Sequence, residues 1–276
     1  MHNLKFTLIT GASEGLGKYL ALECASRRMN LVLVALPNSG LQKLSHYMKQ
    51  QFDIKVVYME TDISTREGCE VVYTAVKNLD LQINILINNA GIGGTFSFDE
   101  RSIEYYNKII NLNVLAPTLL SRLFFSELKN ESKAFILNVS SMAGLFSLPK
   151  KQVYGASKSY LISFSKNLKQ ELLHKNLHVS VLCPGGMDTS WFLTLQNHST
   201  GTWLSRQSIM HPKEVAQIAI NKMLQGKSLI IPGKWNRLFL ILNKLIPVRV
   251  RQLLSNYHIQ TSQNQIPILR DINQAA

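Results

Sequence analysis

The sequence predicts an α/β fold, a doubly wound parallel sheet of about seven strands with helices on both faces. Two observations lead to this fold class. Short runs rich in Val, Ile and Leu alternate along the chain with stretches of helical periodicity. These runs are apolar throughout, which is typical of strands buried on both faces of a parallel sheet. Because no linker rich in Pro, Gly or Ser divides the 276 residues, we expect a single domain.

Each element is expected where its local pattern places it. The strands are expected at Phe6–Thr10, Leu31–Ala35, Lys55–Met59, Ile83–Asn88, Ala134–Ser140, Val179–Cys183 and Leu229–Ile231. The helices are expected at Lys18–Arg28, Leu41–Gln51, Ser64–Leu79, within Ser102–Lys129, at Tyr154–His174 and at Pro212–Leu224. We expect the folded domain to span residues 1–257 and the tail at 258–276, rich in Gln, Asn and Ser, to be mobile.

The composition is that of a globular protein from a reducing compartment. Apolar residues make up 46% of the chain and charged residues 17%, which argues against a disordered or fibrous chain. The cysteines, Cys24, Cys69 and Cys183, are odd in number and widely spaced, so neither a disulfide framework nor a paired metal site is expected. The histidines show no metal-ligand spacing. We therefore expect a cytoplasmic protein that binds no metal.

The positive charge is concentrated near the end of the sequence. The 30 basic and 17 acidic residues give a net charge of +13, and residues 226–257 contain basic residues but no acid among apolar side chains such as Trp235 and Phe239. One interpretation is a helix that makes weak peripheral contact with an anionic membrane. The other, which we favour because Pro247 interrupts the pattern, is a helix pair that closes the substrate cleft or forms a subunit contact. Nucleic acid is not expected as a partner, since no recognition motif accompanies the charge.

A glycine-rich turn, TGASEGLG at residues 10–17, follows the first strand directly. Its glycines allow the backbone to approach a pyrophosphate closely, and the helix that follows presents unpaired N–H groups and its positive dipole end. Taken alone, such a turn can equally be a tight strand-to-helix connection. A dinucleotide site is therefore predicted only together with further motifs.

Further motifs follow in register with the predicted strands. TGASEGLG resembles the opening motif of the short-chain dehydrogenase/reductase family, and Asn88 to Gly91 after the fourth strand resemble its NNAG motif. Asp62 and Ile63 resemble its adenine-contacting pair, and Pro184 to Thr189 its PG-x-x-x-T segment. The resemblance runs from about Lys5 to Ile231 and implies a Rossmann-type fold. It implies cofactor contacts at Gly11, Ser13, Glu14, Gly15, Leu16, Gly17, Leu36, Asp62, Ile63, Asn89, Ala90, Gly91, Tyr154, Lys158, Pro184, Gly185, Met187 and Thr189.

The same resemblance implies a catalytic tetrad of Asn113, Ser141, Tyr154 and Lys158. A phenol can exchange a proton with a substrate oxygen, but its ordinary pKa near 10 requires a nearby cation. Lys158 lies one helical turn after Tyr154 on the same face and can supply it. Ser141 follows the fifth strand and can donate a hydrogen bond to the substrate oxygen. By resemblance, Lys158 also holds the nicotinamide ribose, and Asn113 helps hold a water and the lysine in a proton relay.

The choice of cofactor is expected to depend on the end of the second strand. Val34 to Asn38 include neither an acid for the 2′-hydroxyl of NAD nor a basic residue for the phosphate of NADP. The missing acid at Leu36 removes a repulsion for the 2′-phosphate, whereas Glu14 favours NAD(H). On balance we expect NADP(H) in preference to NAD(H).

These features predict an NAD(P)-dependent oxidoreductase that interconverts a carbonyl and a secondary alcohol, with a ketone or 3-oxoacyl compound as the favoured substrate. Residues 187–211 are expected to form a lid whose Trp191, Phe192, Trp203 and Leu204 favour a hydrophobic substrate, although a lid that packs on its own body would look the same. The alternative is a dinucleotide-sensing or membrane-surface scaffold protein without turnover, against which the intact tetrad argues. By resemblance, the helices holding Asn113 and Tyr154 are expected to form a homodimer or homotetramer.

Overall fold

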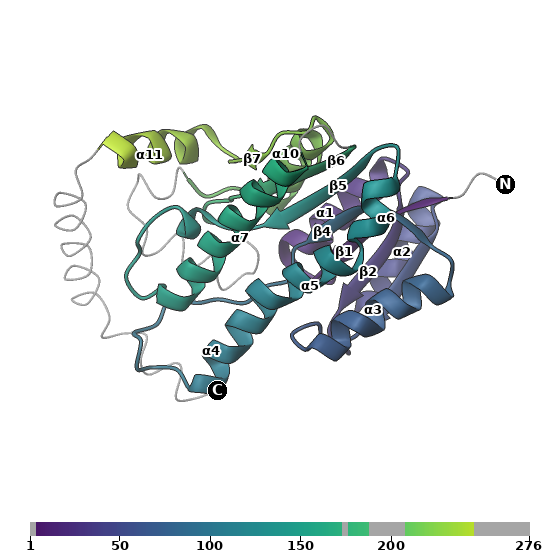
Figure 1. Ribbon diagram of the computed structural model, residues 1–276, viewed down its shortest axis with the longest axis horizontal. Coiled ribbons are helices and arrows are strands. Elements are labelled where there is room, and N and C mark those ends of the chain that lie inside the picture. Colours follow the sequence, from purple (N-terminus) through teal and green to yellow (C-terminus); the bar gives the residue numbers. More distant parts are fainter. Residues whose placement is uncertain (1–3, 173–175, 188–207, 246–276) are drawn as a thin grey trace.

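The computed structural model describes residues 4–172, 176–187 and 208–245, and it contains one seven-stranded parallel sheet (Figure 1). The strands are β1 (Lys5–Thr10), β2 (Asn30–Ala35), β3 (Val56–Glu60), β4 (Gln82–Asn88), β5 (Ala134–Val139), β6 (Leu177–Leu182) and β7 (Leu229–Ile230). Their order is β3-β2-β1-β4-β5-β6-β7. The order reverses between β1 and β4, so the carboxyl ends of these strands flank the crevice in which such sheets bind ligands. The predicted fold class is confirmed.

Helices cover both faces of the sheet. They are α1 (Gly15–Ser26), α2 (Leu41–Phe52), α3 (Arg66–Asn78), α4 (Ile103–Ile110), α5 (Ala116–Leu123), α6 (Phe125–Asn130), α7 (Gln152–Glu171), α10 (Pro212–Leu224) and α11 (Lys234–Leu245). Alternate strand residues face opposite layers: Ile9 and Leu33 pack with α1, α2 and α10, while Leu8 and Val34 pack with α3, α5 and α6. Two apolar layers therefore enclose the sheet, as its continuous apolar strands predict.

The long helix predicted within residues 102–129 is interrupted twice. A π-helical turn, η1 (Asn111–Leu115), separates α4 from α5, and Phe124 separates α5 from α6. Pro117 has no amide hydrogen to donate to the carbonyl four residues earlier, which favours a wider turn at this point. The wider turn carries Asn113, whose side chain is fully buried.

Buried amides connect the sheet to the helices on one face. Asn88 Nδ2 on β4 donates to Asn138 Oδ1 on β5 at 2.8 Å and to Ser121 Oγ on α5 at 3.2 Å. Asn138 Nδ2 in turn donates to Ser165 Oγ on α7 at 2.9 Å. Because buried polar groups are costly when unpaired, this network fixes α5 and α7 against the ends of the central strands.

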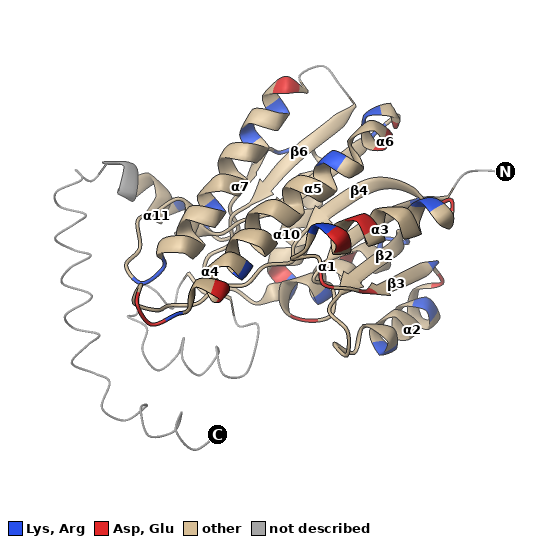
Figure 2. Ribbon diagram, turned by 60° about the horizontal axis from the view of Figure 1, so that its bottom comes forward, with Lys and Arg blue, Asp and Glu red and all other residues tan. Residues whose placement is uncertain are grey.

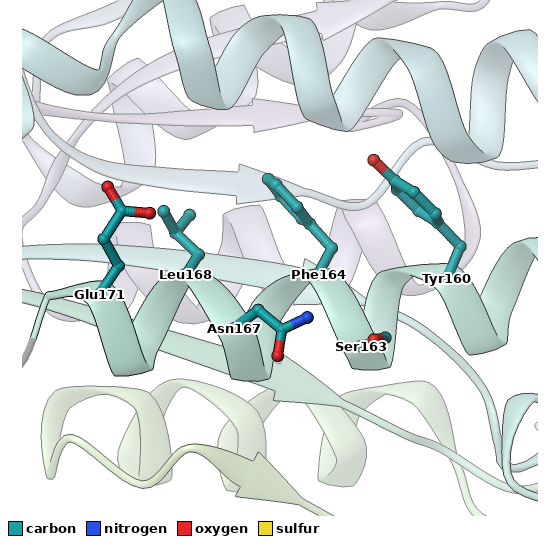
Figure 3. A pocket seen from close by; sticks show the side chains of 6 residues that line it. All are labelled: Tyr160, Ser163, Phe164, Asn167, Leu168 and Glu171. Atoms are coloured by element: carbon teal, nitrogen blue, oxygen red, sulfur yellow. The ribbon is translucent and has the colours of Figure 1, made fainter.

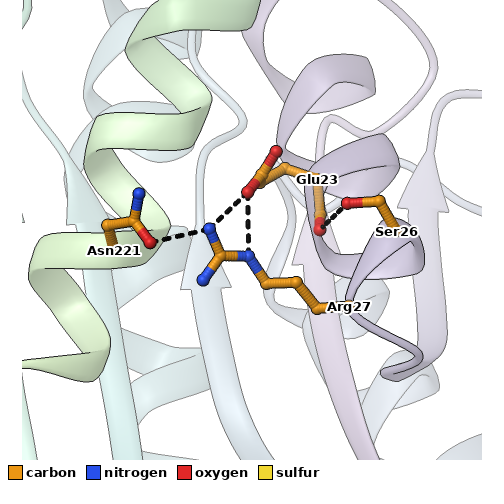
Figure 4. A network of polar contacts seen from close by, with 4 residues as sticks. All are labelled: Glu23, Ser26, Arg27 and Asn221. Atoms are coloured by element: carbon orange, nitrogen blue, oxygen red, sulfur yellow. Dashed lines mark hydrogen bonds and ion pairs between the residues drawn. The ribbon is translucent and has the colours of Figure 1, made fainter.

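On the opposite face, a smaller polar contact joins α1 to α10 (Figure 4). The Arg27 guanidinium is paired with Glu23, one turn earlier on α1, and its Nη2 donates to Asn221 Oδ1 on α10 at 2.8 Å. Exposed ion pairs contribute little to stability, but this one is largely shielded from solvent. It fixes the position of α10 beside the helix that begins at the glycine-rich turn.

The C-terminal part of the described chain ends in α11, which confirms neither interpretation of the basic segment. Leu238, Ile241 and Leu242 are exposed on this helix, and Asn236 is buried. Residues 246–257, the tail at 258–276 and most of the predicted lid lie outside the described residues. Within the described part, no helix is long and apolar enough to cross a membrane.

We expect Asn138→Ala to lower the free energy of unfolding by about 2–4 kcal/mol, because it removes two buried hydrogen bonds and leaves the Asn88 amide without its main acceptor. Urea denaturation monitored by circular dichroism measures this. The matched control is Asn78→Ala, which removes an exposed amide at the end of α3. Equal stability of the two variants would contradict the role of the network.

Candidate active site

The glycine-rich turn packs directly against the helix that follows it. Gly11 and Gly15 adopt left-handed conformations, with φ of +62° and +50°. A Cβ at Gly17 would lie 1.8 Å from the Gly11 carbonyl oxygen, so no side chain fits between the turn and α1. Glu14 caps α1 without a side-chain hydrogen bond, so the amides of the first turn stay open to an anion.

Two residues hold this turn to the loop after β4. Asn89 Nδ2 donates to the carbonyl oxygens of Thr10 and Gly11 at 2.9 and 3.1 Å. The amides of Asn89 and Ala90 both donate to Thr10 Oγ1 at 3.0 Å. Asn89 therefore positions the turn through its side chain. Thr10 was missed among the site residues, although it stands at the head of the TGASEGLG motif.

At the adenosine end of the crevice, the two residues that bear on cofactor choice are open to solvent. Leu36 follows β2 and is 49% exposed, and Glu14 is exposed at the start of α1. Between β2 and α2, Ser39 Oγ is buried and has no hydrogen-bond partner among the described residues. An unpaired buried hydroxyl in this position is available to a ligand.

Two predicted cofactor contacts have side chains that face the core. Leu16 and Ile63 are 6% and 5% exposed, and each belongs to one of the two apolar layers. Asp62 Oδ1 accepts a hydrogen bond from the Ser64 amide at 2.9 Å and so shapes the loop after β3. At Leu16 and Ile63, only the backbone can face a cofactor.

Tyr154 and Lys158 share one side of α7 above the end of β5. Lys158 Nζ donates to the Val139 carbonyl oxygen at 2.9 Å and lies 5.8 Å from the centroid of the Tyr154 ring. Burial lowers the pKa of Lys158 to about 8. Burial also raises the pKa of Tyr154, and a hydrogen bond with Ser141 acts in the opposite direction. The phenol is therefore protonated at neutral pH and can act as a proton donor.

Asn113 lies next to the lysine but uses its amide to hold a loop. Its Oδ1 accepts from the Ile92 amide at 3.0 Å, and its Nδ2 donates to the Ile92 carbonyl at 2.9 Å and to Ser157 Oγ at 3.0 Å. A Cβ at Gly91 would lie 3.0 Å from Asn113 Oδ1 and 3.1 Å from Lys158 Nζ. The structure thus brings Asn113, Gly91 and Lys158 together, and the role of Asn113 in a proton relay stays a prediction.

Ser141 and Gly93 border the tyrosine. Ser141 caps the short 3₁₀ helix η2 (Met142–Gly144), where its Oγ accepts from the Ala143 amide at 3.1 Å. Its one hydroxyl hydrogen can therefore be donated either to the Tyr154 oxygen or to a substrate oxygen beside it. A Cβ at Gly93 would lie 2.3 Å from Tyr154 Cδ2, so the ring packs directly on this backbone. Gly93 was also missed among the site residues. The run Gly91-Ile92-Gly93-Gly94, which continues the NNAG motif, could have indicated it.

The segment after β6 is fixed from both sides. The Pro184 carbonyl oxygen accepts from the Met142 amide at 2.9 Å, and Met187 forms a parallel bridge with Met210. A Cβ at Gly185 would lie 2.5 Å from Oδ1 of Asn236, a buried α11 residue that the sequence did not single out. Thr189, predicted near the nicotinamide, lies outside the described residues.

The cysteines and the possible metal ligands of the described residues offer no second site. Cys24, Cys69 and Cys183 are buried and unpaired, and burial raises the pKa of Cys183 to about 12, which keeps its thiol protonated. No group of three His, Cys, Asp or Glu side chains gathers within the described ranges. The catalytic roles of Tyr154, Lys158 and Ser141 stay a prediction, which their grouping at the end of β5 supports.

The family model for short chain dehydrogenases matches residues 5–199 of this chain. The chain belongs to the short-chain dehydrogenase/reductase family. The ketoacyl reductase HetN of a Nostoc species is 30% identical over 88% of this chain and 83% of its own length. The very-long-chain 3-oxoacyl-CoA reductase of Rattus norvegicus is 30% identical over 65% of this chain and 58% of its own length. A bulky-bulky ketone specific alcohol dehydrogenase from Comamonas testosteroni, 25% identical, superimposes with a TM-score of 0.73 over 97% of this chain and 96% of that chain.

The protein is thus an oxidoreductase of this family, and its residues fit a nicotinamide dinucleotide. Solved structures of the same fold hold NADPH in one case and NAD in another. In this chain, the turn at Gly11 and Gly17 leaves room only for backbone, the first amides of α1 are open, and Ser39 Oγ lacks a partner. These features suit the pyrophosphate and the adenosine end of such a cofactor.

We expect Lys158→Met to abolish turnover and yet leave the protein as stable as, or more stable than, the wild type at pH 7. A pKa lowered from 10.5 to about 8 corresponds to about 3 kcal/mol for burying the ammonium, partly offset in the variant by the lost hydrogen bond to Val139. Between these two pKa values the unfolded wild type binds more protons than the native wild type. Its free energy of unfolding therefore rises relative to that of the variant as pH rises from 8 to 10.5. Chemical denaturation at pH 7 and pH 9.5 measures the gap.

Lys166→Met, which removes an exposed lysine from the same helix, is the control and should show no such pH-dependent gap. A variant at Lys158 that is clearly less stable than the wild type at pH 7 would show that the buried amine stabilises the fold.

Proposed function

We propose that this enzyme is a reductase of hydrophobic ketones or 3-oxoacyl compounds, with NADP(H) as its preferred cofactor. The observation that carries this proposal is the protonated Tyr154 phenol with Lys158 and Ser141 at the carboxyl end of β5. The names of the Nostoc and rat relatives, a ketoacyl reductase and a 3-oxoacyl-CoA reductase, support the substrate class.

The side chains of the site have separate roles in carbonyl reduction. The glycine-rich turn and the first amides of α1 would hold the pyrophosphate, and Lys158 would hold the nicotinamide ribose. When bound, the reduced cofactor supplies a hydride. Ser141 donates a hydrogen bond to the carbonyl oxygen and Tyr154 transfers its proton to the same oxygen, which becomes the alcohol. Because Lys158 is buried beside the phenol, its charge stabilises the phenolate that proton transfer leaves behind.

The preference for NADP(H) rests on Leu36 and Ser39. Leu36 places no acid beside the 2′-position, and the Ser39 hydroxyl can donate to a phosphate oxygen. Glu14 is exposed at the start of α1, where it can turn away from a phosphate. A higher kcat/KM with NADH than with NADPH would contradict this preference.

We also propose that the enzyme assembles as a homodimer or homotetramer through α5 and α7. A hollow of about 310 Å³ runs along α7 between side chains that lie on a different stripe from the buried Lys158 (Figure 3). Tyr160 and Phe164 stack there, and Tyr160 pairs with Thr118 of α5 through their hydroxyls at 3.0 Å. A monomer in sedimentation velocity would contradict the assembly.

The unpaired buried cysteines are consistent with a reducing compartment such as the cytoplasm.

We expect Tyr154→Phe to lower kcat by at least about 100-fold and to leave cofactor affinity within a few-fold of the wild type, because the phenol donates a proton without anchoring the turn. The measurement is oxidation of NADPH and NADH with hydrophobic ketones, aldehydes and 3-oxoacyl thioesters, with cofactor binding followed by fluorescence. Cofactor binding by the wild type without turnover of any compound would favour a dinucleotide sensor instead.

A further inference from the structure

A second lysine lies beside the catalytic phenol. Lys151 precedes α7, and its Nζ is 5.4 Å from the centroid of the Tyr154 ring, about as close as Lys158 Nζ at 5.8 Å. The reduction assigned to Tyr154 and Lys158 makes no use of this second ammonium group. Its position within reach of the substrate therefore needs an explanation of its own.

Lys151 carries its charge without an acidic partner. The side chain is half-buried, and its one hydrogen bond in the described structure is a long one of 3.4 Å to the Gly94 carbonyl oxygen. None of the ion pairs among the described residues includes it. Burial is the cause that lowers its pKa, with no opposing contribution from a carboxylate. A half-buried cation of this kind is stabilised by an anion from outside the chain.

The loop before α4 lies beside Lys151, because the Phe96 amide donates to the Lys150 carbonyl oxygen at 2.8 Å, and Figure 2 shows acidic and basic residues side by side in it. Its acidic residues, with the one in the first turn of α4, are Asp99, Glu100 and Glu104. Asp99 forms no ion pair with Lys151 among the described residues, and the other two acids are engaged with their own segment. Glu100 Oε2 accepts from the Ser97 amide at 2.9 Å, and Glu104 accepts hydrogen bonds in the first turn of α4. The Arg101 guanidinium of the same loop lies 3.7 Å from the centroid of the Phe96 ring and adds a positive charge beside Lys151.

Beside Lys151, a small pocket opens toward Tyr154. Its volume is about 10 Å³, and Lys150 and Gln152 line it together with apolar and aromatic residues that include Phe96, Tyr105 and Ile109. A small group placed here meets aromatic side chains, two lysines and the catalytic phenol, and of the two lysines Lys151 is the one that lies over the Tyr154 ring. Such surroundings suit an apolar chain that ends in a carbonyl and an anionic group.

We propose that Lys151 binds the carboxylate of the substrate, so that the enzyme prefers oxo acids whose carboxylate lies close to the reacting carbonyl. The proposal rests on the carbonyl reduction inferred above. The short distance between Lys151 and Tyr154 is the reason for a nearby carboxylate, because the ketone oxygen has to reach the Tyr154 hydroxyl while the carboxylate reaches Nζ. A thioester at the same carbon presents a neutral oxygen, which accepts a weaker hydrogen bond from an ammonium group than a carboxylate does.

The test compares 3-oxooctanoate with 2-heptanone, which is the same ketone without the carboxylate, and with the N-acetylcysteamine thioester of 3-oxooctanoate. In the wild type, kcat/KM is expected to be highest for 3-oxooctanoate. In Lys151→Met, the ratio of kcat/KM for 3-oxooctanoate to that for 2-heptanone should fall by about tenfold or more, mainly through KM. Lys151→Arg should restore part of the ratio, and Lys166→Met, which removes an exposed lysine further along α7, should leave it unchanged.

Reduction of 2-heptanone by the wild type, with a ratio that Lys151→Met does not change, overturns the assignment of Lys151 and leaves the reductase intact. A wild-type preference for the thioester over the acid overturns the anionic substrate. If no compound is reduced, the proposed function fails, and calorimetric binding of 3-hydroxyoctanoate in the presence of NADP⁺ still decides the inference. About tenfold weaker binding by Lys151→Met supports a carboxylate site, and equal binding overturns it.

Discussion

The active site depends on keeping the Lys158 ammonium buried at the end of β5. Its Nζ donates to the Val139 carbonyl oxygen, and the residue is only 5% exposed. The charge is costly there, as its lowered pKa shows, so α7 has to be fixed strongly enough to keep it in place. The chain of hydrogen bonds from Asn88 through Asn138 to Ser165 does this about two turns further along the helix. Stability of the helix and chemistry of the site are therefore coupled.

The elements that the sequence predicted best are those determined by local pattern. The apolar strands and the Tyr154-to-Lys158 spacing are visible within a few residues, and the observed strand ends lie within two residues of the expected ones. The π-helical turn at Asn113 was not predicted, because helical periodicity does not reveal one additional residue per turn. Thr10 is the last residue of β1 and Asn89 directly follows β4, so their contact forms only when these two strands pair. Asn236 likewise reaches Gly185 from a helix far along the chain.

Polar groups of this protein separate into those that shape the site and those left for a ligand. Asn89 donates through Nδ2 to two backbone carbonyls of the glycine-rich turn, and Asn113 has both ends of its amide engaged with the backbone of Ile92. By contrast, the Ser39 hydroxyl and the Lys151 ammonium have no strong partner in the described chain. This division distinguishes a positioning side chain from a binding one on physical grounds, even where both belong to the same motif.

The bridge between Met187 and Met210 has a consequence for how substrate range can change in this protein. The two residues pair side by side, and α10, which follows Met210 closely, is fixed to α1 by the contact between Arg27 and Asn221. The stretch between the two methionines therefore begins and ends at one anchored point beside the end of β6. The contacts that hold β6 in the sheet and α10 against α1 lie outside this stretch. If it covers the substrate, as its sequence predicts, substitutions in it alter substrate range without a change in Tyr154 or Lys158.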